Sequence, residues 1–151
     1  MTNSNALRVD TVTKVFGGLV AVDDLSFDLA EHEVLGLIGP NGSGKTTVMN
    51  LISGALKVSS GRILLYGEPI SGAPAHVITR MGIARTFQIV RMLPSLTVLE
   101  NVCAGGVFGH CKRWGGELDE FALAQLKRVG LEGSANSPVE ALTYIDQKRV
   151  E

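Results

Sequence analysis

One short glycine-rich segment carries residue types at a spacing that favours a defined chemistry. The segment reads Gly39-Pro40-Asn41-Gly42-Ser43-Gly44-Lys45-Thr46, and Thr47 follows it. Glycines let backbone N–H groups surround an anion, because they adopt positive φ and leave room that a Cβ would fill. Lys45 supplies a charge for the β- and γ-phosphates of a nucleotide, and Thr46 supplies a hydroxyl ligand for Mg²⁺. The segment therefore predicts a phosphate-binding loop for a nucleoside triphosphate, with ATP and Mg²⁺ as the expected ligands.

The spacing alone does not decide among ATP binding, GTP binding and kinase chemistry, and a glycine-rich surface turn is the alternative interpretation. The flanking segments favour the phosphate loop. Residues 34–38 form a continuous apolar run, typical of a strand that is covered on both faces. A helix is expected to begin near Gly44, and its N-terminus adds partial positive charge. The apolar face of this helix comprises Val48, Leu51, Ile52 and Ala55.

An antiparallel hairpin is predicted in front of the loop. Residues 7–16 are rich in β-branched types, Gly17-Gly18 is a turn signal, and residues 20–30 alternate between apolar and polar side chains. In simple nucleotide kinases the phosphate loop usually lies close to the N-terminus. The hairpin therefore argues against that class.

The chain beyond the loop is expected to change from strands to helices. Residues 62–66 and 83–87 predict strands, and residues 75–81 predict a short helix. Thr97 followed by Glu100 is a capping-box pattern at the start of a helix.

The last part of the chain is predicted to contain a loop and two helices. Residues 105–116 have glycine pairs at both ends and predict the loop. Residues 136–138 interrupt the helical pattern, and Thr143 with Asp146 is predicted to cap a final helix. The apolar face of the helix between them comprises Leu118, Phe121, Ala122, Leu126 and Val129.

Composition and charge exclude several other functions. The net charge of -1 provides no general attraction to nucleic acid or to anionic lipid, so no nucleic-acid partner is expected. Cys103 and Cys111 form no CxxC pattern, so neither a metal site nor a disulfide is expected. No apolar run approaches the roughly 18 residues that span a bilayer, and the N-terminus lacks the order of a signal peptide. The expected location is cytoplasmic.

Four segments together resemble the ATP-binding subunit of an ABC transporter, of the branched-chain amino-acid uptake type. They are FGGLVAV at 16–22, GPNGSGKTT at 39–47, MGIARTFQ at 81–88 and LTVLENV at 96–102. The resemblance implies an α/β P-loop NTPase fold, the ABC nucleotide-binding domain. Its antiparallel β subdomain and phosphate-loop core would occupy residues 1–91, and its helical subdomain residues 92–151. It also implies a second ATP-binding subunit, in a homo- or heterodimer, and transmembrane permease subunits that hold the protein at the inner face of the membrane.

The same resemblance assigns roles to two further residues. Phe16 matches the aromatic residue that stacks on adenine, which requires only a π face; the alternative is a core phenylalanine at a hairpin turn. Gln88 matches the glutamine that reaches Mg²⁺ and the attacking water, and that relays the nucleotide state to the membrane subunits. A solvated glutamine after a strand is the alternative.

Two departures from the family pattern affect the expected activity. The signature LSGGQ corresponds to residues 142–146, where Ile145 replaces a glycine and Asp146 replaces the glutamine. This change either weakens a composite site shared with a partner or marks an ordinary helix start. The chain also ends at Glu151, before the second acidic motif, the catalytic glutamate and the switch histidine of the family. A C-terminally truncated domain that binds but does not turn over ATP is therefore expected, with an ABC-type ATPase expected at full length.

The sequence accordingly predicts an energy-coupling subunit in which ATP binding and hydrolysis drive solute transport. Two alternatives stay open at this stage. One is a soluble ABC ATPase without a membrane partner, and the other is a nucleotide-binding module that does not hydrolyse.

Overall fold

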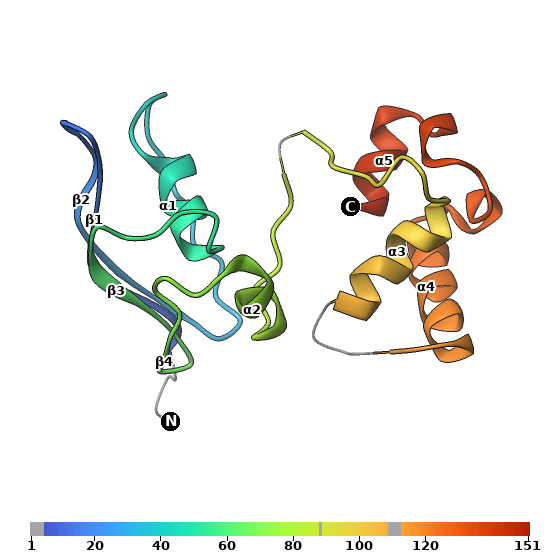
Figure 1. The fold of residues 1–151 in the computed structure, drawn as a ribbon, viewed down its shortest axis with the longest axis horizontal. Coiled ribbons are helices and arrows are strands. Elements are labelled where there is room, and N and C mark those ends of the chain that lie inside the picture. The colour runs from blue at the N-terminus through green and yellow to red at the C-terminus, as the bar shows by residue number, and fades with distance from the viewer. Residues whose placement is uncertain (1–4, 88, 109–112) are drawn as a thin grey trace. The chain divides into compact units, whose positions relative to one another are not determined.

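The computed structural model describes residues 5–87, 89–108 and 113–151. The chain divides into two compact units, Met1–Ile83 and Ala84–Glu151 (Figure 1). Each unit is described separately below. The boundary between subdomains that the sequence places at residues 91 and 92 stays a prediction.

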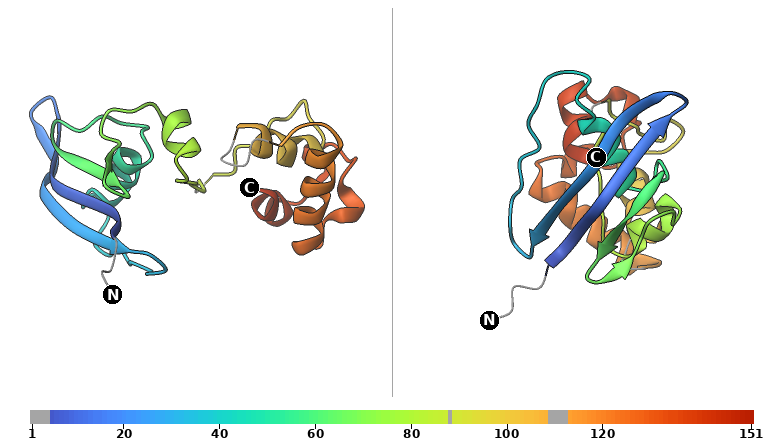
Figure 2. Two further views of the ribbon diagram at one scale, coloured as in Figure 1. Left: turned by 90° about the horizontal axis from the view of Figure 1, so that it is seen from below. Right: turned by 90° about the vertical axis from the view of Figure 1, so that its left-hand side faces the viewer.

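The first unit is built on a four-stranded antiparallel sheet with the strand order β2-β1-β3-β4. Its strands are β1 (Asn5–Phe16), β2 (Leu19–Ala30), β3 (Ser60–Leu65) and β4 (Glu68–Pro69). The long β1–β2 hairpin runs side by side in Figure 2 and pairs Phe16 with Leu19 at its turn, which confirms the predicted hairpin. The strand predicted at residues 62–66 is also confirmed.

Two helices pack their apolar residues against this sheet. These are α1 (Lys45–Ile52), which buries Val48 and Leu51, and α2 (Ala75–Arg80), which buries Ile78. Both helices were expected, but Ala55 is exposed and lies beyond the end of α1. The reason is that Gly54 adopts a φ of 72°, the left-handed conformation that commonly ends a helix.

Two predicted strands are wrong. Residues 34–38 and 83–87 form no strand, and the side chains of Val34 and Ile38 are 96% and 94% exposed. An apolar run can form a strand only where a neighbouring strand satisfies its backbone groups, and no strand of the described residues pairs with either segment. Leu35 and Leu37 instead line an apolar cavity of about 400 Å³ beside the sheet and α1.

The second unit is helical and has its own core. It contains α3 (Val98–Phe108), α4 (Gly116–Arg128), the 3₁₀ turns η1 (Glu132–Ser134) and η2 (Val139–Ala141), and α5 (Tyr144–Val150). The core forms around Val98, Leu126, Leu131 and Ala135. The prediction of an amphipathic helix over α4 is confirmed, because Leu118, Ala122 and Leu126 are buried.

The start of α3 satisfies its backbone N–H groups in two ways. The N–H groups of Val98 and Leu99 donate to the carbonyl oxygens of Ser137 and Ala135 at 3.1 and 2.9 Å. The predicted capping box is also present: Glu100 Oε2 accepts from Thr97 N at 2.7 Å, and Thr97 Oγ1 accepts from Glu100 N at 3.2 Å. The bonds from Val98 and Leu99 hold the beginning of α3 against the segment that follows η1.

The loop predicted at residues 105–116 is wrong at its beginning, because α3 continues through Gly105 and Gly106 to Phe108. A Cβ at Gly106 would lie 2.5 Å from Leu118 Cδ1, so this glycine permits close packing of α3 on α4. Packing thus offsets the cost of about 1 kcal/mol that glycine brings to a helix interior. Residues 109–112 lie outside the described residues. Within the described ranges, no helix is long and apolar enough to cross a membrane.

Candidate functional site

The glycine-rich segment forms a loop that is anchored on β2. Gly42 and Gly44 have φ values of 83° and 86°, in the region that residues other than glycine rarely adopt. Gly44 is the N-cap of α1, and a Cβ at this position would collide with the carbonyl oxygen of Ala21. Glycine is therefore required at residue 44 both by the backbone conformation and by the contact with β2.

The side chain of Lys45 folds over this loop. Its ammonium group donates to the carbonyl oxygens of Gly39 and Pro40 at 2.7 and 2.6 Å, and to Ser43 Oγ at 3.3 Å. An ammonium group has three N–H donors, so each has an acceptor here. The positive charge thus lies at the loop that the sequence predicts to surround phosphate.

The N-terminus of α1 has no internal anion. No side chain caps it, and its first turn contains no acidic residue. The N–H groups of the first turn have no partner within a helix, and they carry the positive end of the helix dipole. This end of α1 is therefore electrostatically suited to an external anion such as a phosphate.

The residues at this position fit a magnesium ion that arrives with a nucleotide. Mg²⁺ prefers oxygen ligands, keeps several waters and uses only one or two protein groups together with phosphates. Thr46 is exposed in the first turn of α1, where its hydroxyl is accessible. The described parts of the chain contain no group of three or more His, Cys, Asp or Glu that could form an all-protein metal site.

A cavity of about 350 Å³ is lined by residues of β2, the glycine-rich loop and α1. Asp23 and Lys45 contribute its charged groups, and Asp23 was not singled out from the sequence. The remaining lining residues are Ala21, Val22, Leu25, Leu37, Ile38, Gly39, Pro40, Ser43 and Val48.

Phe16 lies at the turn of the same hairpin that anchors the loop. Its side chain is 43% exposed, so it is not part of the buried core. Phe16 pairs with Leu19, and the rise along β2 from Leu19 to Ala21 is about 7 Å. One hairpin therefore carries both Phe16, at the end of β1, and the contact of β2 with Gly44. Stacking of Phe16 on adenine stays a prediction.

Gln88, the predicted catalytic and metal-contacting residue, lies outside the described residues. Its neighbour Phe87 belongs to the second unit. The guanidinium groups of Arg85 and Arg91 lie 4.9 and 5.1 Å from the centre of the Phe87 ring. The N–H of Phe87 donates to Glu151 Oε1 at 3.0 Å, so Phe87 contacts the last described residue.

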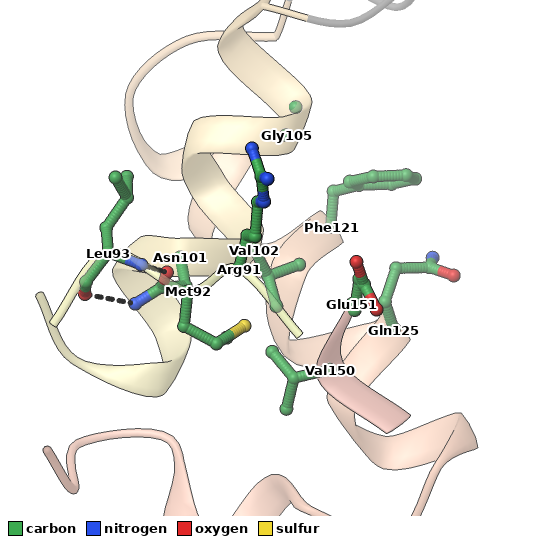
Figure 3. A pocket seen from close by; sticks show the side chains of 11 residues that line it. Arg91, Met92, Leu93, Asn101, Val102, Gly105, Phe121, Gln125, Val150 and Glu151 are labelled. Atoms are coloured by element: carbon green, nitrogen blue, oxygen red, sulfur yellow. Dashed lines mark hydrogen bonds between the residues drawn. The ribbon is translucent and has the colours of Figure 1, made fainter. Parts of the chain in front are cut away.

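A second cavity, of about 490 Å³, lies within the helical unit (Figure 3). Asn101 shapes its border: its Oδ1 accepts from Leu93 N at 2.8 Å, and its Nδ2 donates to the carbonyl oxygens of Leu93 and Thr97 at 3.1 and 2.9 Å. The lining residues are Arg91, Met92, Leu93, Asn101, Val102, Gly105, Gly106, Phe121, Gln125, Val150 and Glu151. The sequence gives no signal for the contact between Asn101 and Leu93, because an asparagine inside a helix does not indicate its partner in a loop.

The altered signature forms the start of α5. Thr143 Oγ1 accepts from Asp146 N at 3.2 Å and donates to Asp146 Oδ2 at 2.7 Å. Arg149 contacts the other carboxylate oxygen of Asp146 at 3.1 Å. The predicted cap of this helix is therefore confirmed.

The chain belongs to the ABC transporter family, whose model matches residues 22–151. It is 39% identical to the high-affinity branched-chain amino acid transport ATP-binding protein LivG of Escherichia coli K12. It is 38% identical to the corresponding protein BraF of Pseudomonas aeruginosa. Each alignment covers 96% of this chain and 62% of the relative, so the chain spans less than two thirds of their length.

The fold comparison agrees with the family. The structure matches MJ1267, an ATP-binding cassette of an ABC transporter, with a TM-score of 0.84 and 32% sequence identity. The match covers 97% of this chain and 62% of that chain. The resemblance inferred from the sequence and the expected ABC nucleotide-binding fold are thereby confirmed.

Proposed function

We propose that this chain binds Mg-ATP and belongs to the energy-coupling subunit of an importer. The single observation that carries the proposal is the phosphate loop itself. Gly44 anchors the loop on β2, and the ammonium of Lys45 lies over it. The uncapped N-terminus of α1 adds donors and positive potential at the same place.

Several residues of the loop, together with Phe16 and Gln88, have proposed roles in this complex. The backbone N–H groups from Asn41 to Thr47 surround the phosphates, and Lys45 exchanges a carbonyl partner for a phosphate oxygen. Thr46 donates its hydroxyl oxygen to Mg²⁺, and the ion neutralises charge on the phosphates when it is bound. Phe16 stacks on the base, and Gln88 is proposed to contact the ion and the attacking water.

Calorimetric titration with Mg-ATP tests the proposal. Lys45→Ala removes a charge-assisted contact worth roughly 1.5–3 kcal/mol, so affinity should fall about ten- to a hundredfold. Lys127→Ala is the matched control, because Lys127 is an exposed lysine on α4 in the helical unit. Equal affinities of Lys45→Ala and the unmodified protein would contradict the assignment.

We further propose that the complete subunit pairs with a second ATP-binding subunit and with transmembrane permeases. Its transported solutes would be branched-chain amino acids, as the names of LivG and BraF support. The protein would lie on the cytoplasmic face of the membrane. The cavity bordered by Asn101 presents apolar groups together with Arg91 and Glu151, and we propose it as a surface for contact with a permease.

Reconstitution tests this wider proposal. The complete subunit is reconstituted with its permeases so that the subunit and ATP are inside the vesicles. These vesicles should take up leucine and release phosphate from ATP. Uptake without phosphate release would contradict coupling to hydrolysis. Phosphate release that is independent of the permeases would favour a soluble ATPase.

A further inference from the structure

Lys14 makes two contacts that place its charge next to the ring of Phe16. Its Nζ lies 4.9 Å from the ring centre of Phe16 and donates to the carbonyl oxygen of Lys57 at 2.8 Å. Residues two apart on a strand point to the same side, which explains why Lys14 and Phe16 meet at the end of β1. The ammonium is therefore held between an aromatic face and a backbone acceptor.

The backbone acceptor is itself fixed to β1. Ser59 N donates to the carbonyl oxygen of Thr13 at 2.9 Å, and Ser59 Oγ accepts from Val15 N at 3.0 Å. These bonds attach the segment containing Lys57 to the strand on both sides of Lys14. The position of the ammonium is thus set by a backbone carbonyl that is itself held on β1.

A cation over an aromatic face leaves the opposite face for another partner. Phe16 is 43% exposed as a residue, so part of its surface is available to a planar ligand. The attraction between the cation and the ring also restrains the ring, which lowers the entropy that stacking would otherwise cost. An aromatic residue at a hairpin turn without such a contact would have more freedom.

We propose that Lys14 is a positioning residue that holds Phe16 ready to stack on the base of the bound nucleotide. This inference rests on the proposed ATP binding and assigns Lys14 to the base, whereas Lys45 is assigned to the phosphates. Lys14 therefore contributes to the affinity for ligands that contain a base. It does not contribute to the affinity for phosphate chains alone.

The test compares two ligands on the same protein, Mg-ATP and magnesium tripolyphosphate, which has no base. Lys14→Met retains an apolar stem and removes the charge, and it should weaken Mg-ATP about two- to fivefold while leaving tripolyphosphate unchanged. Lys14→Arg should restore the ratio, because a guanidinium also stacks on aromatic rings. The ratio of the two affinities is measured in one sample, so a partly unfolded variant does not mimic the effect.

A double-mutant cycle with Phe16→Leu separates positioning from a direct contact. If Lys14 acts through the ring, Lys14→Met should have no further effect on the ratio in the Phe16→Leu background. Equal weakening of both ligands by Lys14→Met, or an undiminished effect without the ring, would overturn the inference. Failure of the proposed nucleotide site looks different, because Lys45→Ala would then leave tripolyphosphate binding unaltered.

Discussion

Two helices of this chain begin in opposite ways. Helix α1 starts at Gly44 with no side-chain cap and no acidic residue in its first turn. Helix α5 starts at Thr143, whose side chain caps it, and Asp146 places a carboxylate in its first turn. Both helix starts expose the positive end of a helix dipole, but only the start of α5 already has an anion of its own.

The difference shows how the same backbone feature acquires different uses. A helix N-terminus that lacks a side-chain acceptor satisfies its N–H groups with water or with a ligand. One that contains a threonine and an aspartate at capping spacing satisfies them internally. The contacts at α5 therefore favour the structural interpretation of the altered signature, whereas α1 retains the electrostatics of an anion site.

The largest effect is expected from a substitution at the N-terminus of α1, which has no side-chain cap. Gly44→Ala places a Cβ against the carbonyl oxygen of Ala21 at a φ of 86°, so both a collision and backbone strain oppose it. Strain of about 1–2 kcal/mol and overpacking of about 1–3 kcal/mol should lower the free energy of unfolding, as measured in urea. Binding of Mg-ATP should also be lost.

Gly42→Ala is the control for this change. Gly42 has a similar φ of 83°, but a Cβ there would meet nothing within 4 Å. It should cost only the strain, about 1–2 kcal/mol. If the two variants are equally stable, the contact between Gly44 and β2 does not anchor the loop.

A smaller effect is expected at the N-terminus of α5, which Thr143 caps. Thr143→Ala removes the acceptor of the Asp146 N–H, and loss of an N-cap typically costs about 1 kcal/mol. The unfolding of the helical unit should shift accordingly in thermal melts followed by circular dichroism. Thr143→Ser retains the hydroxyl and should behave like the unmodified protein. Destabilisation by both variants to the same extent would mean that the hydroxyl is not the cap.

The smallest effect concerns the capping box of α3 and its dependence on pH. Hydrogen bonds from the backbone and side chain of Thr97 lower the pKa of Glu100 below its ordinary value of 4.5. A carboxyl with a lowered pKa stabilises the fold above its unfolded-state value, and this stabilisation is lost as pH falls through the lower folded value. The midpoint of unfolding should therefore decrease below about pH 4.5.

Glu100→Gln removes the ionisable group at this position. The part of the pH dependence that belongs to the capping box should then disappear from urea titrations at pH 6 and pH 3. An identical pH profile in both proteins would show that Glu100 is not responsible for it.

Most predicted features whose interacting groups are close in sequence are present in the structure. The hairpin turn after Phe16 and the caps at Thr97 and Thr143 each join residues within a few positions, and all three are present. The contacts of Lys45 with the carbonyl oxygens of Gly39 and Pro40 also lie within one short segment, and phosphate binding by this segment stays a prediction.

The errors in the strands and in the 105–116 loop share a different cause, since each depended on a distant neighbour. Residues 34–38 have the composition of a covered strand, but a strand forms only beside another strand. Gly105 and Gly106 have the composition of a loop, but the packing of Leu118 against Gly106 keeps them in α3. Composition alone does not report such contacts.

The sequence by itself therefore determined the glycine-rich loop, the hairpin, the helix caps and the family, because these depend on residue type and short spacing. Only the tertiary structure decided which apolar segments are covered and which contacts surround the site. Lys14 contacts the carbonyl oxygen of Lys57 although 43 positions separate them, and Gly44 lies directly against the backbone of Ala21 in β2. Contacts of this kind arise when the chain folds back on itself, and their geometry depends on the packing of the whole sheet.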